Sequence, residues 1–153
     1  MKSNWFILSL PISFLYLLRL LGLFLLMPVF SVLAMQLKGA TPQLIGVALG
    51  AYGLTQAATQ LLFGWASDRW GRHRLITLGL GLLLLGSLLG AWATSIQGMI
   101  FARCLQGSGA IGSVLLALLT DVVPSEHRTK AMAIIGVSIG ISFSVAMVVG
   151  PVL

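Results

Sequence analysis

Charged side chains of both signs gather at one point of an otherwise apolar sequence, the segment 64–74. It has the spacing Gly-x-x-x-Asp-Arg-x-Gly-Arg and contains Gly64, Asp68, Arg69, Gly71, Arg72 and Arg74. A carboxylate and a guanidinium at neighbouring helix ends can form an ion pair, and an Asp121–Arg72 pair fits this geometry. Such a pair can act as a latch when packed helices shield it, because it then forms in one conformation and breaks in another. If both charges are instead solvated, the pair is worth only about 0–1 kcal/mol.

Two further arginines, Arg19 and Arg103, lie inside long apolar runs. An arginine at the centre of a bilayer costs at least about 3 kcal/mol, so it usually faces a cavity or an internal partner. On a helix, Arg103 shares a face with Gln106 and Gly107. The alternative for Arg103 is a side chain that snorkels to the membrane interface.

The acidic residues cannot serve as partners for these two arginines. They are Asp68, Asp121 and Glu126, and all three lie at the ends of apolar runs or in loops. The partners of Arg19 and Arg103 must therefore be carbonyls, water, an anionic ligand, lipid headgroups or further protein.

The composition predicts a membrane protein. Hydrophobic residues make up 58% of the 153 residues, charged residues make up 8%, and the mean hydropathy is +1.05. Soluble domains carry about 25% charged residues. The net charge of +6 is dispersed among apolar runs and short loops, so we expect no nucleic-acid partner. The lone Cys104 cannot form an internal disulfide, and we expect neither a metal site nor a cofactor.

Five apolar stretches predict membrane-spanning helices at about residues 5–35, 44–66, 75–93, 99–122 and 131–153. Helices satisfy the backbone hydrogen bonds internally, as lipid requires. A β-barrel would need shorter segments of alternating polarity, and none is present. The predicted fold is therefore an all-α, polytopic membrane bundle.

Basic residues predict the orientation of this bundle. One side collects Lys2, Arg69, Arg72, Arg74, Arg128 and Lys130, and the other side has only Lys38. The positive-inside rule then places the N-terminus and the 68–74 loop in the cytoplasm.

Small residues form a stripe along the second predicted helix. The members of this stripe recur at helical spacing and are Gly46, Gly50, Gly53, Ala57, Gln60 and Gly64, with Gln56 beside them. Later helices repeat the pattern at Gly86 and Gly90 and at Gly136 and Gly140. Small residues allow helices to approach closely in lipid, so we interpret these stripes as packing surfaces rather than as substrate contacts.

The sequence resembles the major facilitator superfamily in three places. Residues 64–74 are similar to motif A of that family, although Trp65 replaces an aliphatic residue and His73 displaces the terminal basic pair. Residues 103–110, Arg-Cys-Leu-Gln-Gly-Ser-Gly-Ala, resemble motif B. The pattern Gly136-x-x-x-Gly140, followed by Gly150-Pro151, resembles motif C of antiporters. The nearest group by these features is the drug:proton antiporter-like group.

This resemblance implies a secondary transporter that works by alternating access, with two six-helix bundles rocking about a central site. It implies that Asp68 and the Arg72–Asp121 pair close the cytoplasmic side. It also implies that Arg103 lies near the coupling pathway, with Arg19, Gln106, Gly107, Gln56 and Gln60 as the other candidate pathway residues. Gly136, Gly140, Gly150 and Pro151 would shape the fifth helix.

The resemblance further implies proton-coupled antiport or efflux of a small molecule in a bacterial inner membrane. The chain corresponds to about five helices of the N-terminal bundle and ends within the fifth. We therefore expect a fragment or truncated product whose missing partner is a C-terminal bundle.

Other classes of function are disfavoured or left open. An intramembrane protease needs a nucleophile and a base in the membrane, but Ser108 lies in Gln-Gly-Ser-Gly and both histidines lie in loops, so we expect no enzyme. One alternative is a truncated, non-transporting membrane subunit or remnant that packs with a partner chain through its glycine faces. Another is a homo-oligomeric pore.

Overall fold

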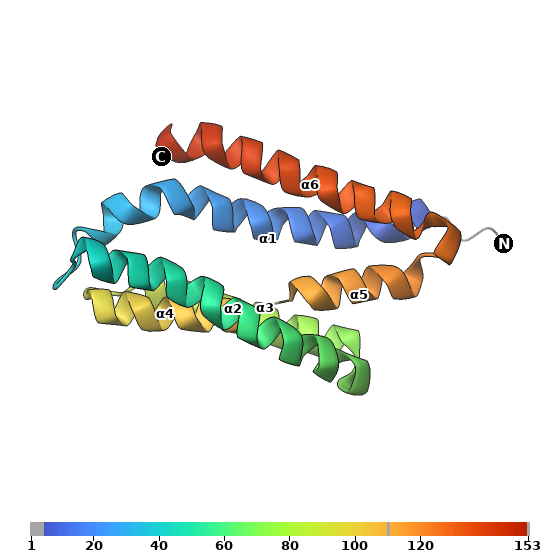
Figure 1. Cartoon of the computed structure of the whole chain (residues 1–153), viewed down its shortest axis with the longest axis horizontal. Coiled ribbons are helices and arrows are strands. Elements are labelled where there is room, and N and C mark those ends of the chain that lie inside the picture. Colours follow the sequence, from blue (N-terminus) through green and yellow to red (C-terminus); the bar gives the residue numbers. More distant parts are fainter. Residues whose placement is uncertain (1–4, 110, 153) are drawn as a thin grey trace. The chain divides into compact units, whose positions relative to one another are not determined.

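The computed structural model describes residues 5–109 and 111–152, and all named elements of this part are helices (Figure 1). The α-helices are α1 (Trp5–Ala34), α2 (Pro42–Trp70), α3 (Arg72–Ala91), α4 (Ile96–Ser108), α5 (Gly112–Val122) and α6 (Arg128–Val149). Two short 3-10 helices follow α5 and α6, namely η1 (Ser125–His127) and η2 (Gly150–Val152). The all-α fold class predicted from the sequence is confirmed.

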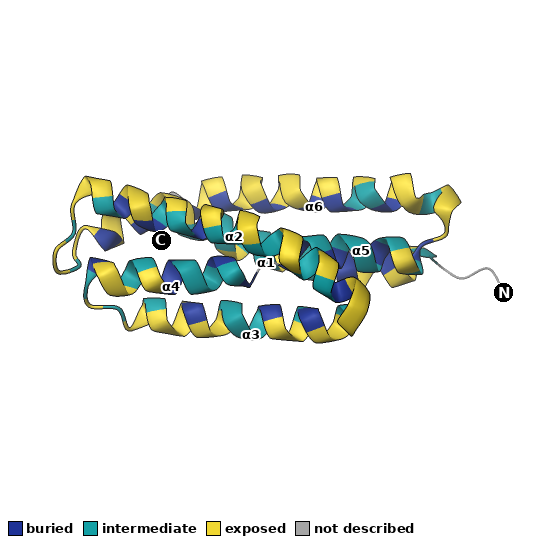
Figure 2. Ribbon diagram, turned by 60° about the horizontal axis from the view of Figure 1, so that its bottom comes forward, coloured by how far each residue is buried: buried dark blue, intermediate teal, exposed yellow. Residues whose placement is uncertain are grey.

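The chain forms two compact units, which we describe separately. We call residues 31–114 the central unit; it holds α2, α3 and α4. We call residues 1–30 with 115–153 the terminal unit; it holds most of α1 and α5, and all of α6. Exposed residues alternate with buried ones around the individual helices (Figure 2).

Local capping explains where α2 and α4 begin in the central unit. The Thr41 hydroxyl accepts a hydrogen bond from the Leu44 amide, and Ser95 does the same for Gly98. Hydroxyl side chains at this position satisfy amides that the first helical turn leaves without a partner. The turn before α2 and the turn before α4 are also joined to each other, because the Lys38 backbone amide donates to the Thr94 carbonyl over 3.1 Å. The ends of α1 and α3 are thereby linked through backbone hydrogen bonds.

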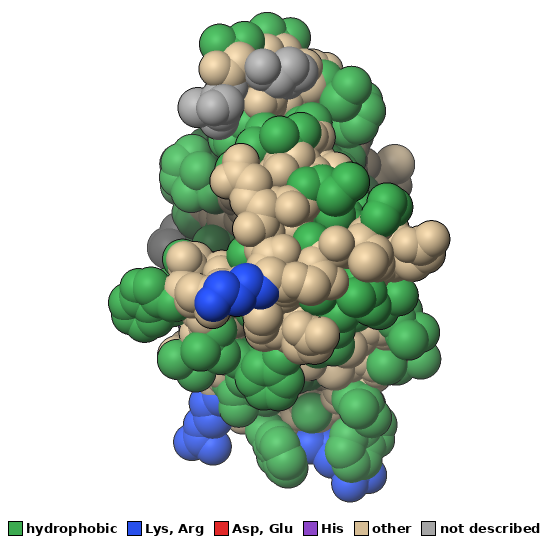
Figure 3. Space-filling view, turned by 90° about the vertical axis from the view of Figure 1, so that its left-hand side faces the viewer, with side chains coloured by type: hydrophobic (Ala, Val, Ile, Leu, Met, Phe, Trp, Pro, Cys, Tyr) green, Lys and Arg blue, Asp and Glu red, His purple; other side chains and the backbone are tan. Residues whose placement is uncertain are grey.

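The membrane-facing character of the helices is visible in their exposed side chains. Leucines such as Leu54 and Leu61 on α2 are 75% and 79% exposed. Hydrophobic side chains cover much of the face shown in Figure 3. Such apolar exposure is far above what a water-soluble monomer tolerates, and it fits a lipid environment.

Four helical stretches are long and apolar enough to cross a membrane, judged by length and composition. They are Trp5–Ala34, Arg72–Ala91, Ile96–Val122 and Ser125–Val149. The remaining predicted span, 44–66, corresponds to α2, which has 29 residues but carries Thr55, Gln56, Thr59 and Gln60 in its interior. These polar residues lower its hydropathy without shortening it.

The predicted span 99–122 lies within the candidate span Ile96–Val122, but the helix is interrupted there, because α4 ends at Ser108 and α5 begins at Gly112. Glycine is a poor helix former, and Gly107, Gly109 and Gly112 lie at this break. The Ile111 amide donates to the Gly109 carbonyl instead of continuing the helical ladder. The Gly107 carbonyl accepts a hydrogen bond from the Thr59 hydroxyl of α2 over 3.3 Å, so it is satisfied despite the break. Ala110, the last residue of the motif B pattern, lies outside the described residues.

The predicted charged loop 68–74 is wrong in detail. Asp68 and Arg69 belong to the last turn of α2, Arg72 begins α3, and Gly71 alone separates the two helices. Gly71 has a φ of +93°, a backbone conformation that side chains with a Cβ rarely adopt. A single glycine is therefore sufficient for the turn, and both helices extend beyond the bounds 44–66 and 75–93.

Contacts between α1 and α6 hold the terminal unit together. The Ser142 hydroxyl donates to the Leu17 carbonyl over 3.0 Å, and the Phe24 and Phe143 rings meet edge to face at 5.5 Å. Gly150 is buried beside Pro28, where a Cβ would lie 2.6 Å from the proline ring. The helix predicted for 131–153 ends at Val149 and continues as η2, while Leu153 lies outside the described residues.

Candidate functional site

The candidate site in the central unit is built around Arg103, which is only 2% exposed although it lies on an apolar helix. Its Nη1 donates to the Oε1 of Gln106, one turn further along α4, over 3.0 Å. Its guanidinium carbon lies 5.4 Å from the ring centroid of Tyr52 on α2, within the range of a cation–π contact. A snorkelling side chain would be exposed, so this burial argues against the interface alternative for Arg103.

A second hydrogen bond extends this arrangement to α3. The Nε2 of Gln106 donates to the Ser87 hydroxyl over 3.0 Å, and Ser87 in turn donates to the Leu83 carbonyl. Both ends of the Gln106 amide are thus in use, and its oxygen is directed toward Arg103. A hydrogen-bonded chain therefore runs from Arg103 through Gln106 to Ser87.

Two residues of this cluster, Tyr52 and Ser87, are absent from the sequence-based candidates. Tyr52 lies one turn before Gln56 on α2, and Ser87 is adjacent to Gly86 on α3. The sequence signal that could have identified them is a polar residue beside a small residue on an apolar helix. Spacing does not show which neighbouring helix such a polar side chain contacts.

Glycines bring the three helices close together at the level of Arg103. A Cβ on Gly107 would clash with the Thr55 side chain and the Tyr52 carbonyl of α2. On the opposite side of α4, a Cβ on Gly86 of α3 would lie 2.6 Å from the backbone nitrogen of Gln106. These distances are shorter than real side chains allow, so α4 is held in backbone contact with both neighbours.

The predicted pathway glutamines of α2, Gln56 and Gln60, contact this region through their backbone. The Gln60 carbonyl accepts a hydrogen bond from the Ser113 hydroxyl over 3.0 Å. The Gln56 amide nitrogen would lie 3.2 Å from a Cβ on Gly107. These two residues therefore help to position α2 against α4 and the start of α5.

The charged turn between α2 and α3 forms a second cluster in the same unit. The Nη1 of Arg72 lies 2.5 Å from the Oδ1 of Asp68 and also donates to the Ser67 hydroxyl. Ser67 is buried and donates to the Gly64 carbonyl over 2.7 Å. Arg72 is therefore anchored across the Gly71 break to the last turn of α2. Ser67 is a further residue that motif spacing did not single out.

The remaining predicted members of this cluster are placed differently. Arg69 is exposed, and its guanidinium lies 4.4 Å from the centroid of the Trp65 ring. Asp121 lies at the exposed end of α5 in the terminal unit, while Arg72 belongs to the central unit. The Asp121–Arg72 pair accordingly stays a prediction.

Arg19 lies on α1 in the terminal unit and differs from Arg103 in its surroundings. Its Nε and Nη2 atoms are buried and make no hydrogen bond within the part of the chain that the structure describes. Buried guanidinium nitrogens without an acceptor are costly in lipid. A partner of acceptor or anionic character is therefore expected at Arg19.

The glycines of the motif C pattern fall into two groups. Gly136 and Gly140 are exposed on α6, and among the described residues no atom lies within 4 Å of a Cβ added to either. Gly150 is packed on Pro28, and Pro151 follows it in η2. Gly150 thus shapes the contact with α1, while Gly136 and Gly140 present a smooth open surface.

Comparison with known proteins gives consistent relatives. The inner membrane transport protein YajR of Escherichia coli is 52% identical over 136 residues, which cover 89% of this chain and 30% of that protein. An uncharacterized transporter of Buchnera aphidicola is 43% identical over 99% of this chain and 39% of its own length. The class H tetracycline resistance protein of Pasteurella multocida is 29% identical over 87% of this chain and 33% of its own length.

The first two of these relatives are named as transport proteins, and this chain spans about a third of the length of all three. The sequence also matches the Major Facilitator Superfamily over residues 12–153, nearly all of the chain. Together with the apolar helices, this match makes the chain a multi-pass membrane protein. The chain belongs to the major facilitator superfamily of transporters.

Proposed function

We propose that this chain is the N-terminal part of a secondary active transporter that moves a small molecule across a bacterial inner membrane in exchange for protons. The observation that carries the proposal is Arg103, a buried cation on a membrane helix of a transporter-family chain. A hydrogen bond to Gln106 and the ring of Tyr52 hold its guanidinium in position inside the central unit. A cation held in a low-dielectric site responds strongly to the arrival of an anionic group or a proton-carrying carboxylate. Such a response is what ion-coupled transport requires.

Alternating access would then involve the charged turn between α2 and α3. Arg72 reaches Asp68 and Ser67 within its own turn, and Asp68 is 64% exposed on the outer side of that pair. An exposed carboxylate can contact a facing helix end in one conformation and lose that contact in another. We place this turn and the N-terminus in the cytoplasm, because most of the basic residues lie on that side.

The transport proposal is tested with a joined protein in which this chain replaces the matching segment of YajR. Everted membrane vesicles that contain the joined protein are energised, and small molecules are screened for their ability to dissipate the pH gradient. Proton-coupled antiport predicts substrate-dependent proton release that is absent from vesicles without the protein. If the joined protein inserts but a panel of cationic, anionic and neutral compounds leaves the gradient intact, the proposal is wrong.

The latch gives a specific prediction in the same joined protein. Asp68→Asn and Arg72→Ala should each reduce the substrate-dependent proton flux about tenfold or more, because each removes one charge from the switching contact. Membrane insertion, measured as the yield of folded protein in detergent, should stay close to that of the unsubstituted protein. Lys38→Gln, at the other end of the central unit, is the matched control and should leave the flux unchanged. Normal flux in both latch variants would remove the latch from the mechanism.

A second candidate function is a non-transporting subunit that packs against a partner chain. Open glycine surfaces favour it, because a Cβ on Gly46, Gly50 or Gly53 of α2 would meet no atom within 4 Å among the described residues. Such surfaces allow a further helix to approach closely. Cysteine cross-linking from Gly50→Cys in native membranes tests this candidate. Efficient cross-linking to a separate chain supports a subunit, whereas its absence, combined with transport by the joined protein, excludes one.

A further inference from the structure

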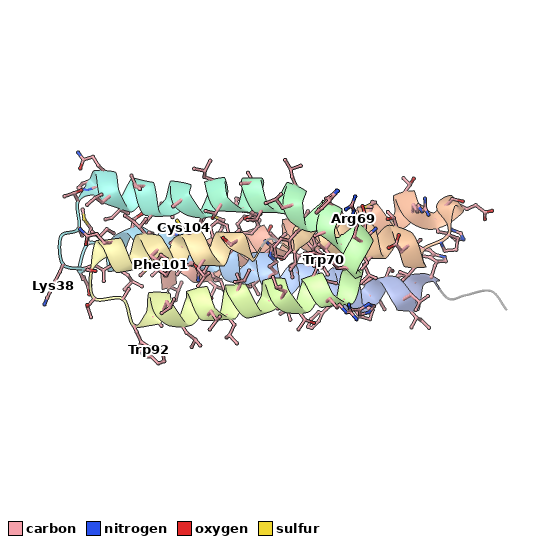
Figure 4. All side chains as sticks on the ribbon, turned by 90° about the horizontal axis from the view of Figure 1, so that it is seen from below. Lys38, Arg69, Trp70, Trp92, Phe101 and Cys104 are labelled. Carbon is pink, nitrogen blue, oxygen red and sulfur yellow. The ribbon has the colours of Figure 1, made fainter. Side chains whose placement is uncertain are left out.

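Exposed arginines and tryptophans gather on the outer surface of the α2–α3 turn. Trp65 and Trp70 are 57% and 64% exposed, and Arg69 and Arg74 are exposed beside them. Arg69 lies over the Trp65 ring, and Figure 4 shows Arg69 and Trp70 together at this end of the central unit. We call Trp65, Arg69, Trp70 and Arg74 the basic–aromatic turn.

Positive charge is in excess at this turn. The segment 64–78 holds three arginines and one aspartate, a net charge of +2. The aspartate, Asp68, is paired with Arg72, whose side chain is the less exposed member of that pair. Asp68 is itself 64% exposed, but the paired Arg72 offsets its charge, so the net positive charge of the turn is that of Arg69 and Arg74, and it attracts anions.

The length of α2 places this turn at the membrane surface. At 1.5 Å per residue its 29 residues span about 43 Å, whereas the hydrocarbon core of a bilayer is about 30 Å thick. Trp65 and Trp70 occupy the last turns of α2, and Trp92 lies at the opposite end of the central unit (Figure 4). Tryptophans at both ends are typical of the two membrane interfaces. Arginines accompany them only at the α2–α3 end of this unit.

A shallow surface hollow on α3 adjoins the basic–aromatic turn. It is lined by His73, Arg74, Thr77 and Leu78, and it is open to the surroundings rather than enclosed. Arg74 supplies a cation near the membrane surface, and Leu78, which is 50% exposed, lies one turn further along α3. A cation next to an exposed apolar side chain at the membrane surface suits a molecule with an anionic head and hydrocarbon chains.

We infer that the basic–aromatic turn and this hollow bind the headgroup of an anionic phospholipid. Arg69 and Arg74 contact the phosphate, the two tryptophans lie at the level of the glycerol esters, and an acyl chain follows Leu78. Basic residues beside a membrane helix attract anionic lipid in this way. A bound lipid would hold the ends of α2 and α3 at the membrane surface, next to the Asp68–Arg72 pair.

The test uses the full chain in nanodiscs, with Trp5→Phe and Trp92→Phe so that only Trp65 and Trp70 report. Quenching of their fluorescence by brominated phosphatidylglycerol is compared with quenching by brominated phosphatidylcholine at one fixed ionic strength. Each arginine near a membrane surface contributes about a fivefold preference for anionic lipid. We expect brominated phosphatidylglycerol to be favoured about 10- to 25-fold, and R69Q/R74Q to abolish this preference. R69K/R74K should retain most of it, because lysine preserves the charge.

The matched control is K38Q/K130Q, which removes the same number of exposed charges from residues outside the basic–aromatic turn and should keep the preference. A preference near one in the parent protein, no change in R69Q/R74Q, or an equal loss in the control overturns the inference. Displacement by millimolar inorganic phosphate would also overturn it, because the site would then take a free anion rather than a lipid. If R69Q/R74Q fails to insert, R74Q alone replaces it, with an expected fivefold loss.

Discussion

Gly107→Ala is expected to destabilise the folded protein by about 2 kcal/mol, in the middle of the range of about 1–3 kcal/mol that an added methyl group costs in a packed interior. The new Cβ would overlap the Thr55 side chain and the Tyr52 carbonyl, and the latter is backbone that cannot rotate away. The α2–α4 contact would have to open, and with it the hydrogen bond from Thr59 to the Gly107 carbonyl. The free energy of unfolding is measured by titrating the detergent-solubilised protein with sodium dodecyl sulfate.

Gly53→Ala on α2 is the matched control for this substitution. Among the described residues, no atom lies within 4 Å of a Cβ added at Gly53, and alanine is the better helix former. Its stability should therefore stay unchanged or rise slightly. Gly86→Ala on α3 should behave like Gly107→Ala, because its Cβ would lie 2.6 Å from the backbone nitrogen of Gln106 and 2.9 Å from the Ala102 carbonyl. Equal stability of Gly107→Ala and Gly53→Ala would show that α2 and α4 are not in backbone contact.

Arg103→Met in the joined transporter is expected to reduce substrate-dependent proton flux about 100-fold, equivalent to about 2.7 kcal/mol of lost coupling energy. Methionine is similar in length and apolar, so the substitution removes the charge while helix packing is preserved. The Gln106 oxygen and the Tyr52 ring would lose their cationic neighbour. The measurement is the dissipation of the pH gradient in everted vesicles, normalised to the amount of inserted protein.

Two companion variants separate a coupling role from a general loss of charge. Arg103→Lys keeps the charge but cannot reproduce the planar donor geometry, so an intermediate flux, reduced about tenfold, is expected. Lys130→Met removes one exposed charge in the terminal unit and should transport normally. Flux above half of the normal value in Arg103→Met would exclude Arg103 from coupling. A deficit explained by lower protein yield would assign Arg103 a purely structural role.

The glycines illustrate how far spacing alone can be taken. Gly46, Gly50 and Gly53 are spaced four and three residues apart, and Gly86 and Gly90 are four residues apart. Both patterns predict close helix packing. In the structure, a Cβ on Gly86 would collide with α4, whereas the three glycines of α2 have open space within the described chain. Spacing defines a face of a helix, but the neighbour of that face depends on tertiary contacts.

The break between α4 and α5 shows a second limit. The apolar run 99–122 is long enough for one span, and nothing in its hydropathy marks an interruption. The interruption depends on Thr59 and the Gln60 carbonyl of α2, which form hydrogen bonds with Gly107 and Ser113 on either side of it. Backbone groups in a membrane leave a helical ladder only where another element satisfies them.

The all-α membrane class, the family and the approximate spans could be predicted from the sequence, because apolar length and motif spacing are local properties. The position of Arg103 between Gln106 and Tyr52, with Ser87 of α3 bonded to the Gln106 side-chain amide, could not be predicted and is known from the folded structure. The partner of a polar side chain in lipid is selected by which helices touch and at what height. That choice belongs to residues far apart in the chain, so no local pattern records it.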